Sequence, residues 1–170
     1  PVMCLSADSL DFGLVYVGGI SDRILTITNT GTAVLLVNNM NTTEPAFSIV
    51  GSTNFSIAPG GNHDVTIRFT PTSANQYSAS ISVNNNSAEN SVDVSLNAEG
   101  TTTITDIDGN IYEIIRIGSQ WWMAENLRVA RYRNGDAIPN VADANAWPNL
   151  TTGAYCNYDN SETNFVTYGR

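Results

Sequence analysis

Residues 1–100 consist of short runs in which apolar and polar residues alternate. In one run Val65, Ile67 and Phe69 share a phase, and the run ends before Pro71. Successive side chains of a β-strand point to opposite faces, so this alternation predicts strands with one buried face. About seven such runs fall within roughly 95 residues, with turn residues every 8 to 12 positions or so, which is typical of an immunoglobulin-like sandwich. We therefore predict an immunoglobulin-like antiparallel β-sandwich over residues 1–100.

Composition excludes several classes of function. The 170-residue chain contains no lysine, so Schiff-base and lysine-nucleophile chemistry are excluded. Its formal net charge of -9 has the wrong sign for a protein that binds phosphates or anionic lipid, and we expect no nucleic-acid partner. No stretch approaches the roughly 20 consecutive apolar residues of a membrane helix, so we expect no membrane-spanning segment.

Several motifs in the first hundred residues follow the order of a known domain pattern. They include LDFG at residues 10–13, ITNTG at residues 27–31 and VTIRFTP at residues 65–71. Together they resemble the ASH/Hydin-type immunoglobulin-like domains, and the resemblance covers nearly all of residues 5–100. Such domains are common in bacterial extracellular proteins, so the resemblance implies a sandwich that acts as a spacer or an adhesive module.

The character of the sequence changes after Gly100, because 9 of the 15 aromatic residues, including all three tryptophans, follow it. The segments TDIDGNIY (105–112), SQWWMAENLR (119–128) and GAYC (153–156) resemble the Fibrobacter succinogenes major paralogous domain, a family of secreted and surface proteins. Since the family pattern continues beyond Arg170, the resemblance implies that residues 101–170 are the truncated, N-terminal part of such a domain.

The second segment is expected to be loop-rich with some β-structure. Residues 103–106 and 111–117 read as two strands around the Asp-Gly turn at Asp108 and Gly109, because Asp-Gly supplies the positive φ that a hairpin needs. Beyond Trp122 we expect loops and one helical turn within residues 125–131.

Asp106, Asp108 and Asn110 place oxygen ligands in an order similar to that of calcium loops. An EF-hand loop needs a further carboxylate before its glycine and a glutamate at position 12, and both are missing here. Turn chemistry alone accounts for Asp, Gly and Asn in such a segment. We expect a plain turn and no cofactor, with bound Ca²⁺ as the alternative.

Trp121, Trp147, Tyr155 and Tyr158 are the candidate ligand-binding residues, because flat aromatic rings stack well on apolar faces of ligands. The alternative is that they pack in the core. Neighbouring residues of a strand point to opposite faces, so at most one of Trp121 and Trp122 can meet a ligand. The family motif favours Trp122 as the core residue, which leaves Trp121 as the one more accessible to a ligand.

The sequence shows no catalytic constellation. His63 is the only histidine and follows a turn, and the two cysteines, Cys4 and Cys156, lie at opposite ends of the chain. These residues supply neither a nucleophile with its base nor a closed zinc site. We therefore expect a non-enzymatic module of a secreted or cell-surface bacterial protein, with the periplasm as another location, that binds a glycan or a surface protein. The alternative is an accessory segment of an extracellular polysaccharide-degrading enzyme.

Overall fold

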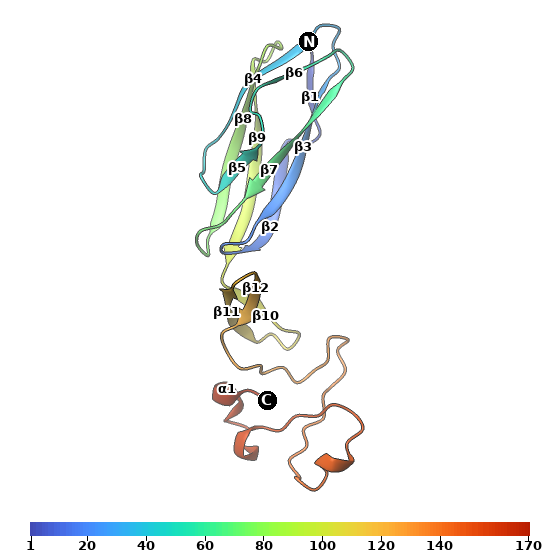
Figure 1. Ribbon diagram of the computed structural model, residues 1–170, viewed down its shortest axis with the longest axis vertical. Helices are drawn as coiled ribbons and strands as arrows, with labels where there is room; N and C mark the ends of the chain where they lie inside the picture. Colours follow the sequence, from blue (N-terminus) through green and yellow to red (C-terminus); the bar gives the residue numbers. More distant parts are fainter. The chain divides into compact units, whose positions relative to one another are not determined.

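The computed structural model describes all residues, Pro1–Arg170, and the chain folds as two units (Figure 1). The first unit, Pro1–Thr101, is called the sandwich here, and Thr102–Arg170 is called the second unit. The sandwich strands are β1 (Met3–Leu5), β2 (Ser9–Tyr16), β3 (Ser21–Asn29), β4 (Leu35–Thr42), β5 (Phe47–Val50), β6 (Phe55–Ile57), β7 (Asn62–Phe69), β8 (Gln76–Asn85) and β9 (Ser91–Thr101).

The strands of the sandwich form two sheets, in the orders β1-β3-β7-β5 and β2-β9-β8-β4-β6, so the predicted immunoglobulin-like fold is confirmed. One pair departs from the antiparallel pattern of the sandwich, since β2 runs parallel to β9. Only residues 6–8 separate β1 from β2, and β1 belongs to the other sheet. The chain thus changes sheets through a short connection, which leaves β2 beside the last strand of the sandwich.

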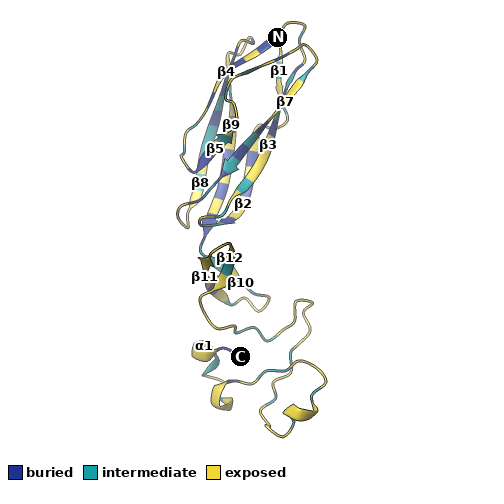
Figure 2. Cartoon of the chain, viewed as in Figure 1, coloured by how far each residue is buried: buried dark blue, intermediate teal, exposed yellow.

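Alternate residues of the strands fill the space between the sheets, as the period of two predicts (Figure 2). The rings of Phe12, Phe47 and Phe69 form a cluster, with centroid separations of 5.3, 5.9 and 4.8 Å. Tilted aromatic pairs of this kind add about 0.5–1.5 kcal/mol to the gain from burial. This core lies wholly within the sandwich.

Asn29 is a fully buried polar residue at the end of β3. Its side-chain oxygen accepts hydrogen bonds from the backbone N–H groups of Val2 (3.3 Å) and Gly31 (3.1 Å). Its amide nitrogen donates to the carbonyl oxygens of Ala33 (2.8 Å) and Ile57 (3.1 Å). One side chain therefore fixes the residues preceding β1, the turn after β3 and the end of β6. The burial of this residue was not predicted.

The second unit contains one antiparallel sheet in the order β10-β11-β12, followed by loops and short helical segments. Its elements are β10 (Thr103–Thr105), β11 (Ile111–Ile117), β12 (Gln120–Met123), the 3-10 turns η1 (Trp147–Asn149) and η2 (Tyr158–Asn160), and the helix α1 (Phe165–Tyr168). The two predicted strands are present. None of the helices has the length and apolar character that crossing a membrane requires.

The predicted helical turn within residues 125–131 was wrong, because side chains take the hydrogen bonds that a helix would need. The N–H of Arg128 donates to the Tyr112 hydroxyl (2.8 Å), and the carboxylate of Glu125 accepts the N–H of Glu113 (3.0 Å). The segment is therefore held in an irregular conformation against β11. A helical turn occurs instead at α1, which was not predicted.

The second unit has little hydrophobic core. Tyr112 is its only buried hydrophobic residue, whereas all the others lie in the sandwich. Most of the unit is exposed in Figure 2. Its order must therefore depend on polar contacts to an unusual degree, and these contacts surround Asp106.

Candidate functional site

Asp106 is the centre of a hydrogen-bond network between β10 and β11. One carboxylate oxygen accepts the backbone N–H groups of Asp108 and Asn110, both at 2.9 Å. The other accepts the side-chain amide of Asn110 (2.9 Å) and the hydroxyl of Tyr112 (2.6 Å). Gly109 provides the positive φ, 82°, that closes the turn. Both oxygens of the carboxylate are thus used to hold the hairpin.

Tyr112 extends this network to the loop after β12. Its hydroxyl donates to Asp106 and accepts the N–H of Arg128, whose guanidinium carbon lies 4.6 Å from the centre of the Tyr112 ring. Burial raises the pKa of Tyr112, and its bond to Asp106 raises it further. Burial acts to raise the pKa of Asp106 as well, but the hydrogen bonds from Tyr112 and Asn110 outweigh it and lower this pKa.

The structure does not bring the three predicted calcium ligands together as a cation site. Asp106 is occupied by four donors, and Asn110 presents its amide nitrogen, not its oxygen, to Asp106. Asp108 accepts the N–H of Ala130 (2.6 Å) and pairs with Arg131 at 3.2 Å. No group of three or more His, Cys, Asp or Glu side chains is placed to hold a metal ion. The loop is a hydrogen-bonded turn that ties the hairpin to residues 128–131.

This network predicts that the second unit loses stability in acid. A carboxylate whose folded pKa is lowered stabilises the fold above its unfolded pKa, near 3.8 for Asp106, and loses that contribution as the pH falls through the folded value. Glu125, whose pKa the Arg128 side chain lowers, acts in the same direction. We expect the free energy of unfolding, measured with urea by tryptophan emission, to fall between about pH 5 and about pH 2. An unchanged value across this range would contradict the prediction.

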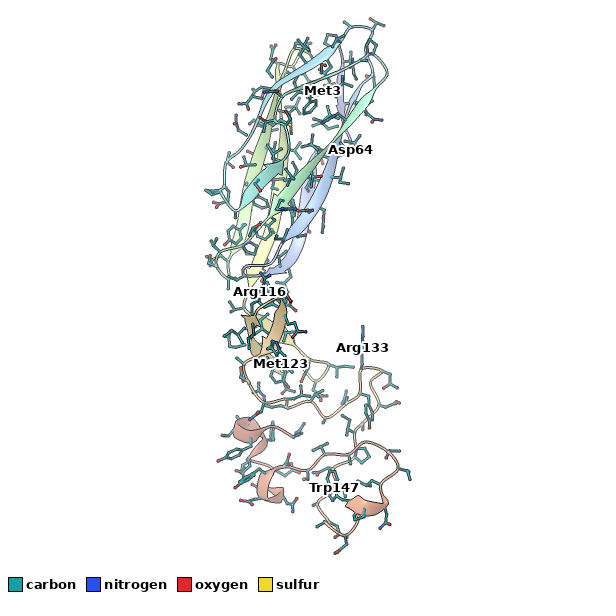
Figure 3. All side chains as sticks on the ribbon, viewed as in Figure 1. Met3, Asp64, Arg116, Met123, Arg133 and Trp147 are labelled. Atoms are coloured by element: carbon teal, nitrogen blue, oxygen red, sulfur yellow. The ribbon has the colours of Figure 1, made fainter.

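The four predicted ligand-binding aromatic residues lie in different surroundings. Trp121 is partly buried, with the Arg116 guanidinium 5.9 Å from its ring. Trp147, labelled in Figure 3, begins η1 and donates its indole N–H to the carbonyl of Val141 (3.0 Å).

Arg170 lies over the ring of Tyr155 at 5.2 Å and over that of Phe165 at 4.4 Å. Tyr158 is 56% exposed and lies against Tyr168, with ring centroids 4.6 Å apart. Tyr155 is thus covered by a cation, whereas Tyr158 stands at the surface. The four residues therefore do not share one set of contacts.

The expectation that Trp122 is a core residue was wrong, because its side chain is 54% exposed. Trp122 lies opposite Ile115 in the register of β11 and β12, and paired residues share a face of the sheet. Tyr112, the buried residue of β11, is an odd number of positions from Ile115 and therefore points to the other face. Trp122 therefore lies on the face of the sheet opposite to the buried Tyr112.

Trp122 belongs to an exposed apolar surface, called the isoleucine face here, whose other members are Ile111, Ile115 and Ile117. Their side chains are between 53% and 59% exposed. Alternation along β11 puts the three isoleucines on one side, together with the exposed Glu113 between Ile111 and Ile115, and the register adds Trp122 to them. This surface was not predicted, although the alternation of Ile111, Ile115 and Ile117 along the strand indicates it.

No catalytic arrangement is formed by the residues considered for one. His63 is exposed on β7 and stacks on Phe55, with ring centroids 3.9 Å apart. Its neighbour Asp64 accepts the hydroxyl of Thr26 (2.6 Å) on β3. Both cysteines are exposed free thiols. The histidine therefore contacts a phenylalanine ring, and the adjacent carboxylate serves the β3–β7 pair.

Comparison with known proteins gives two family matches that divide the chain. Residues 1–99 match the HYDIN/CFA65/VesB-like, Ig-like domain, and residues 115–170 match the Fibrobacter succinogenes major domain. Both predicted resemblances are confirmed. No curated protein matches the sequence.

Solved structures similar to this chain share the sandwich fold. The ASH/PapD-like domain 7 of human CEP192 has a TM-score of 0.52 and 16% identity, over 58% of this chain and 84% of that one. A protein of unknown function from Porphyromonas gingivalis W83 has a TM-score of 0.52 and 26% identity, over 58% of this chain and 46% of that one. This chain therefore spans less than half of the Porphyromonas gingivalis protein. Because the family model covers more than half of its length, the chain belongs to the HYDIN/CFA65/VesB-like, Ig-like domain family.

Proposed function

We propose that this chain is a non-catalytic module of a secreted or surface-displayed bacterial protein, and that its second unit binds a protein partner through the isoleucine face. The sandwich serves as the spacer. The observation that carries the proposal is the exposure of four large apolar side chains, each more than half accessible, on one face of the β10–β12 sheet. The two family matches support the modular organisation.

An exposed surface of this kind is costly in water. Contiguous apolar patches on soluble proteins mark interaction sites, and tryptophan is enriched among the residues that dominate binding energy. Fully burying one exposed side chain of this kind contributes about 1.5–3 kcal/mol, and these four are a little over half exposed. Together they therefore offer roughly 3–6 kcal/mol before the costs of association. The isoleucine face therefore has the composition of an interface centre.

The chemistry of the isoleucine face favours a protein over a glycan. Isoleucine side chains offer no hydrogen-bond donor or acceptor, whereas a sugar covered on one side needs partners for its hydroxyl groups. Branched aliphatic side chains on a pleated surface instead fit the apolar side chains of another polypeptide. The partner we propose is thus a protein with an apolar contact surface.

The proposal predicts that Trp122→Ala leaves the fold intact. An exposed tryptophan should change the free energy of unfolding by about 0.5 kcal/mol or less, whereas a core tryptophan would cost about 3–5 kcal/mol. Urea unfolding followed by the emission of the remaining tryptophans, Trp121 and Trp147, measures the difference. Ile107→Ala, another exposed apolar position in the same unit, is the matched control. A loss of several kcal/mol in Trp122→Ala alone would contradict the exposed position.

A glycan ligand is the second candidate, and the exposed pair Tyr158 and Tyr168 favours it. Both rings are more than half exposed and adjacent, so they offer an aromatic surface with two hydroxyl groups at its edge. Such binding would also suit an accessory segment of a polysaccharide-degrading enzyme. On a glycan array, Tyr158→Ala and Tyr168→Ala should each lose any signal that the unaltered chain gives. Binding retained by both variants would exclude this pair as the site.

A further inference from the structure

We propose that a groove in the sandwich, between β1 and the beginning of β9, binds an extended cationic peptide segment that adds to the sandwich as a strand. The groove has a cavity volume of about 530 Å³, within the roughly 300–1,000 Å³ of typical ligand pockets. Its apolar lining comes from Met3, Leu5, Ala7 and Val92. Figure 3 labels Met3, which marks the β1 side of the groove. This site is separate from the isoleucine face and does not depend on it.

The first side of the groove is the open edge of β1, which is the outermost strand of its sheet. Val2 accepts the N–H of Thr30, and the N–H of Ser6 donates to Thr26, so these even-numbered residues direct their polar backbone groups toward β3. Backbone groups of a strand alternate in direction, so Met3 and Leu5 direct theirs away from β3. β1 therefore presents a short row of backbone groups to an added strand.

The second side is an open stretch of β9. The N–H of Ser95 donates to the carbonyl of Asp8, and β2 pairs with β9 only from Ser9 and Ser95 onward. Backbone groups alternate in direction, so Asp93 directs its N–H and carbonyl to the same edge of β9 as Ser95 does. β2 does not extend as far as Asp93 along this edge. The sheet change between β1 and β2 thus leaves backbone groups directed into the groove from the edge of each sheet. Strand addition requires one such open edge, and the edge of β1 provides it.

Charge selects the kind of peptide. Asp8, Glu89 and Asp93 are among the groove-lining residues, and none forms an ion pair with an arginine. One carboxylate oxygen of Asp93 accepts the hydroxyl of Ser82 (2.6 Å), and its negative charge is not neutralised by that bond. The only cationic side chains of the sandwich are Arg23 and Arg68. Arg68 pairs with Asp22 at 2.8 Å, and Arg23 donates to the backbone of β2. The rim therefore attracts lysine or arginine side chains that alternate with apolar residues facing the lining.

A second copy of this chain is a poor occupant of the groove. The chain has a formal net charge of -9 and no lysine, so a second copy would bring like charge to an acidic rim. Like charges brought together oppose association, whereas a basic segment of another protein would be attracted. The proposed occupant is accordingly a basic segment from outside this chain.

The test uses three fluorescent, end-capped decapeptides and the full chain, with binding followed by fluorescence anisotropy. The first peptide alternates Lys with Val, the second alternates Glu with Val, and the third alternates Lys with Pro and so keeps the charge but cannot pair as a strand. We expect binding of the Lys-Val peptide alone, weakened several-fold when ionic strength rises from about 0.05 M to about 0.5 M.

Two triple variants locate the site. Asp8→Asn, Glu89→Gln and Asp93→Asn together should weaken binding of the Lys-Val peptide by about tenfold, since each exposed charge makes a small contribution and the three act together. The control triple, Glu44→Gln, Asp64→Asn and Glu99→Gln, removes the same charge outside the groove and should leave most of the affinity.

A second readout does not depend on charge variants. Cys4 lines the groove, so the bound Lys-Val peptide should slow its reaction with a thiol reagent in a Cys156→Ser chain. The proposal would be overturned if the Lys-Val peptide did not bind, or if the Lys-Pro peptide bound equally well. It would also be overturned if both triple variants weakened binding equally, or if Cys4 stayed unprotected at saturating peptide.

Discussion

Asp106→Ala is expected to destabilise the second unit by about 3 kcal/mol or more, because hydrogen bonds to a charged group contribute about 1.5–3 kcal/mol each and one replacement removes four. It also leaves the hydroxyl of buried Tyr112 without its acceptor. All three tryptophans lie in the second unit, so their emission during urea unfolding reports on this unit selectively. We expect the transition to shift to much lower urea or to disappear.

The matched control for Asp106→Ala is Glu162→Ala, which removes an exposed carboxylate from the same unit. Its transition should remain within about 0.5 kcal/mol of the unaltered chain. The acid sensitivity of the second unit should also be smaller in Asp106→Ala, since the carboxylate with the lowered pKa is gone. Equal stability of the two variants would show that the network around Asp106 does not hold the hairpin.

Asn29→Ala is expected to cost the sandwich about 4 kcal/mol. The replacement leaves two N–H groups and two carbonyl groups without their side-chain partner, the carbonyl of Ile57 in a buried environment and the other three in partly buried ones. A buried polar group left unpaired costs about 1–3 kcal/mol, and a partly buried one costs less. Water entering the vacated space would recover part of this cost.

The loss in Asn29→Ala is measurable as a lower thermal midpoint in far-ultraviolet circular dichroism, while tryptophan emission from the second unit should change little. Asn62→Ala, an exposed asparagine at the start of β7, is the control and should be close to neutral. Because Val2 is one partner of Asn29, amide exchange at β1 should increase in Asn29→Ala. A neutral Asn29→Ala would mean that these contacts do not hold the sandwich.

The sandwich could be predicted from local pattern because its strands each bury one face. Val65, Ile67 and Phe69 are buried as the period of two requires. The parallel pairing of β2 with β9 could not be predicted in this way, since alternation reports which face is buried and not which neighbour a strand meets. The buried role of Asn29 depends on contacts with residues 27 and 28 positions away along the chain, Val2 and Ile57.

The second unit was harder to predict, because side-chain hydrogen bonds replace a core. The Asp-Gly turn indicated the hairpin, but the bond of Tyr112 with Arg128 joins residues 16 apart and prevents the expected helical turn. The positions of Trp121 and Trp122 depend on which face of the sheet carries Tyr112. A family motif does not encode that face. The register between β11 and β12 decides which of the two tryptophans shares a face with Tyr112, and only the structure shows this register.

Photo-cross-linking from the isoleucine face tests the central claim most directly. A benzophenone amino acid replaces Ile115 in the intact protein, in the cells that produce it, and a matched chain carries the same group at Glu162. We expect a covalent adduct with a second polypeptide from position 115 and not from position 162, and we expect Trp122→Ala to abolish it. A protein-binding role for this face would be contradicted if both positions gave equal adducts, if adducts formed only within the same polypeptide, or if position 115 gave no adduct.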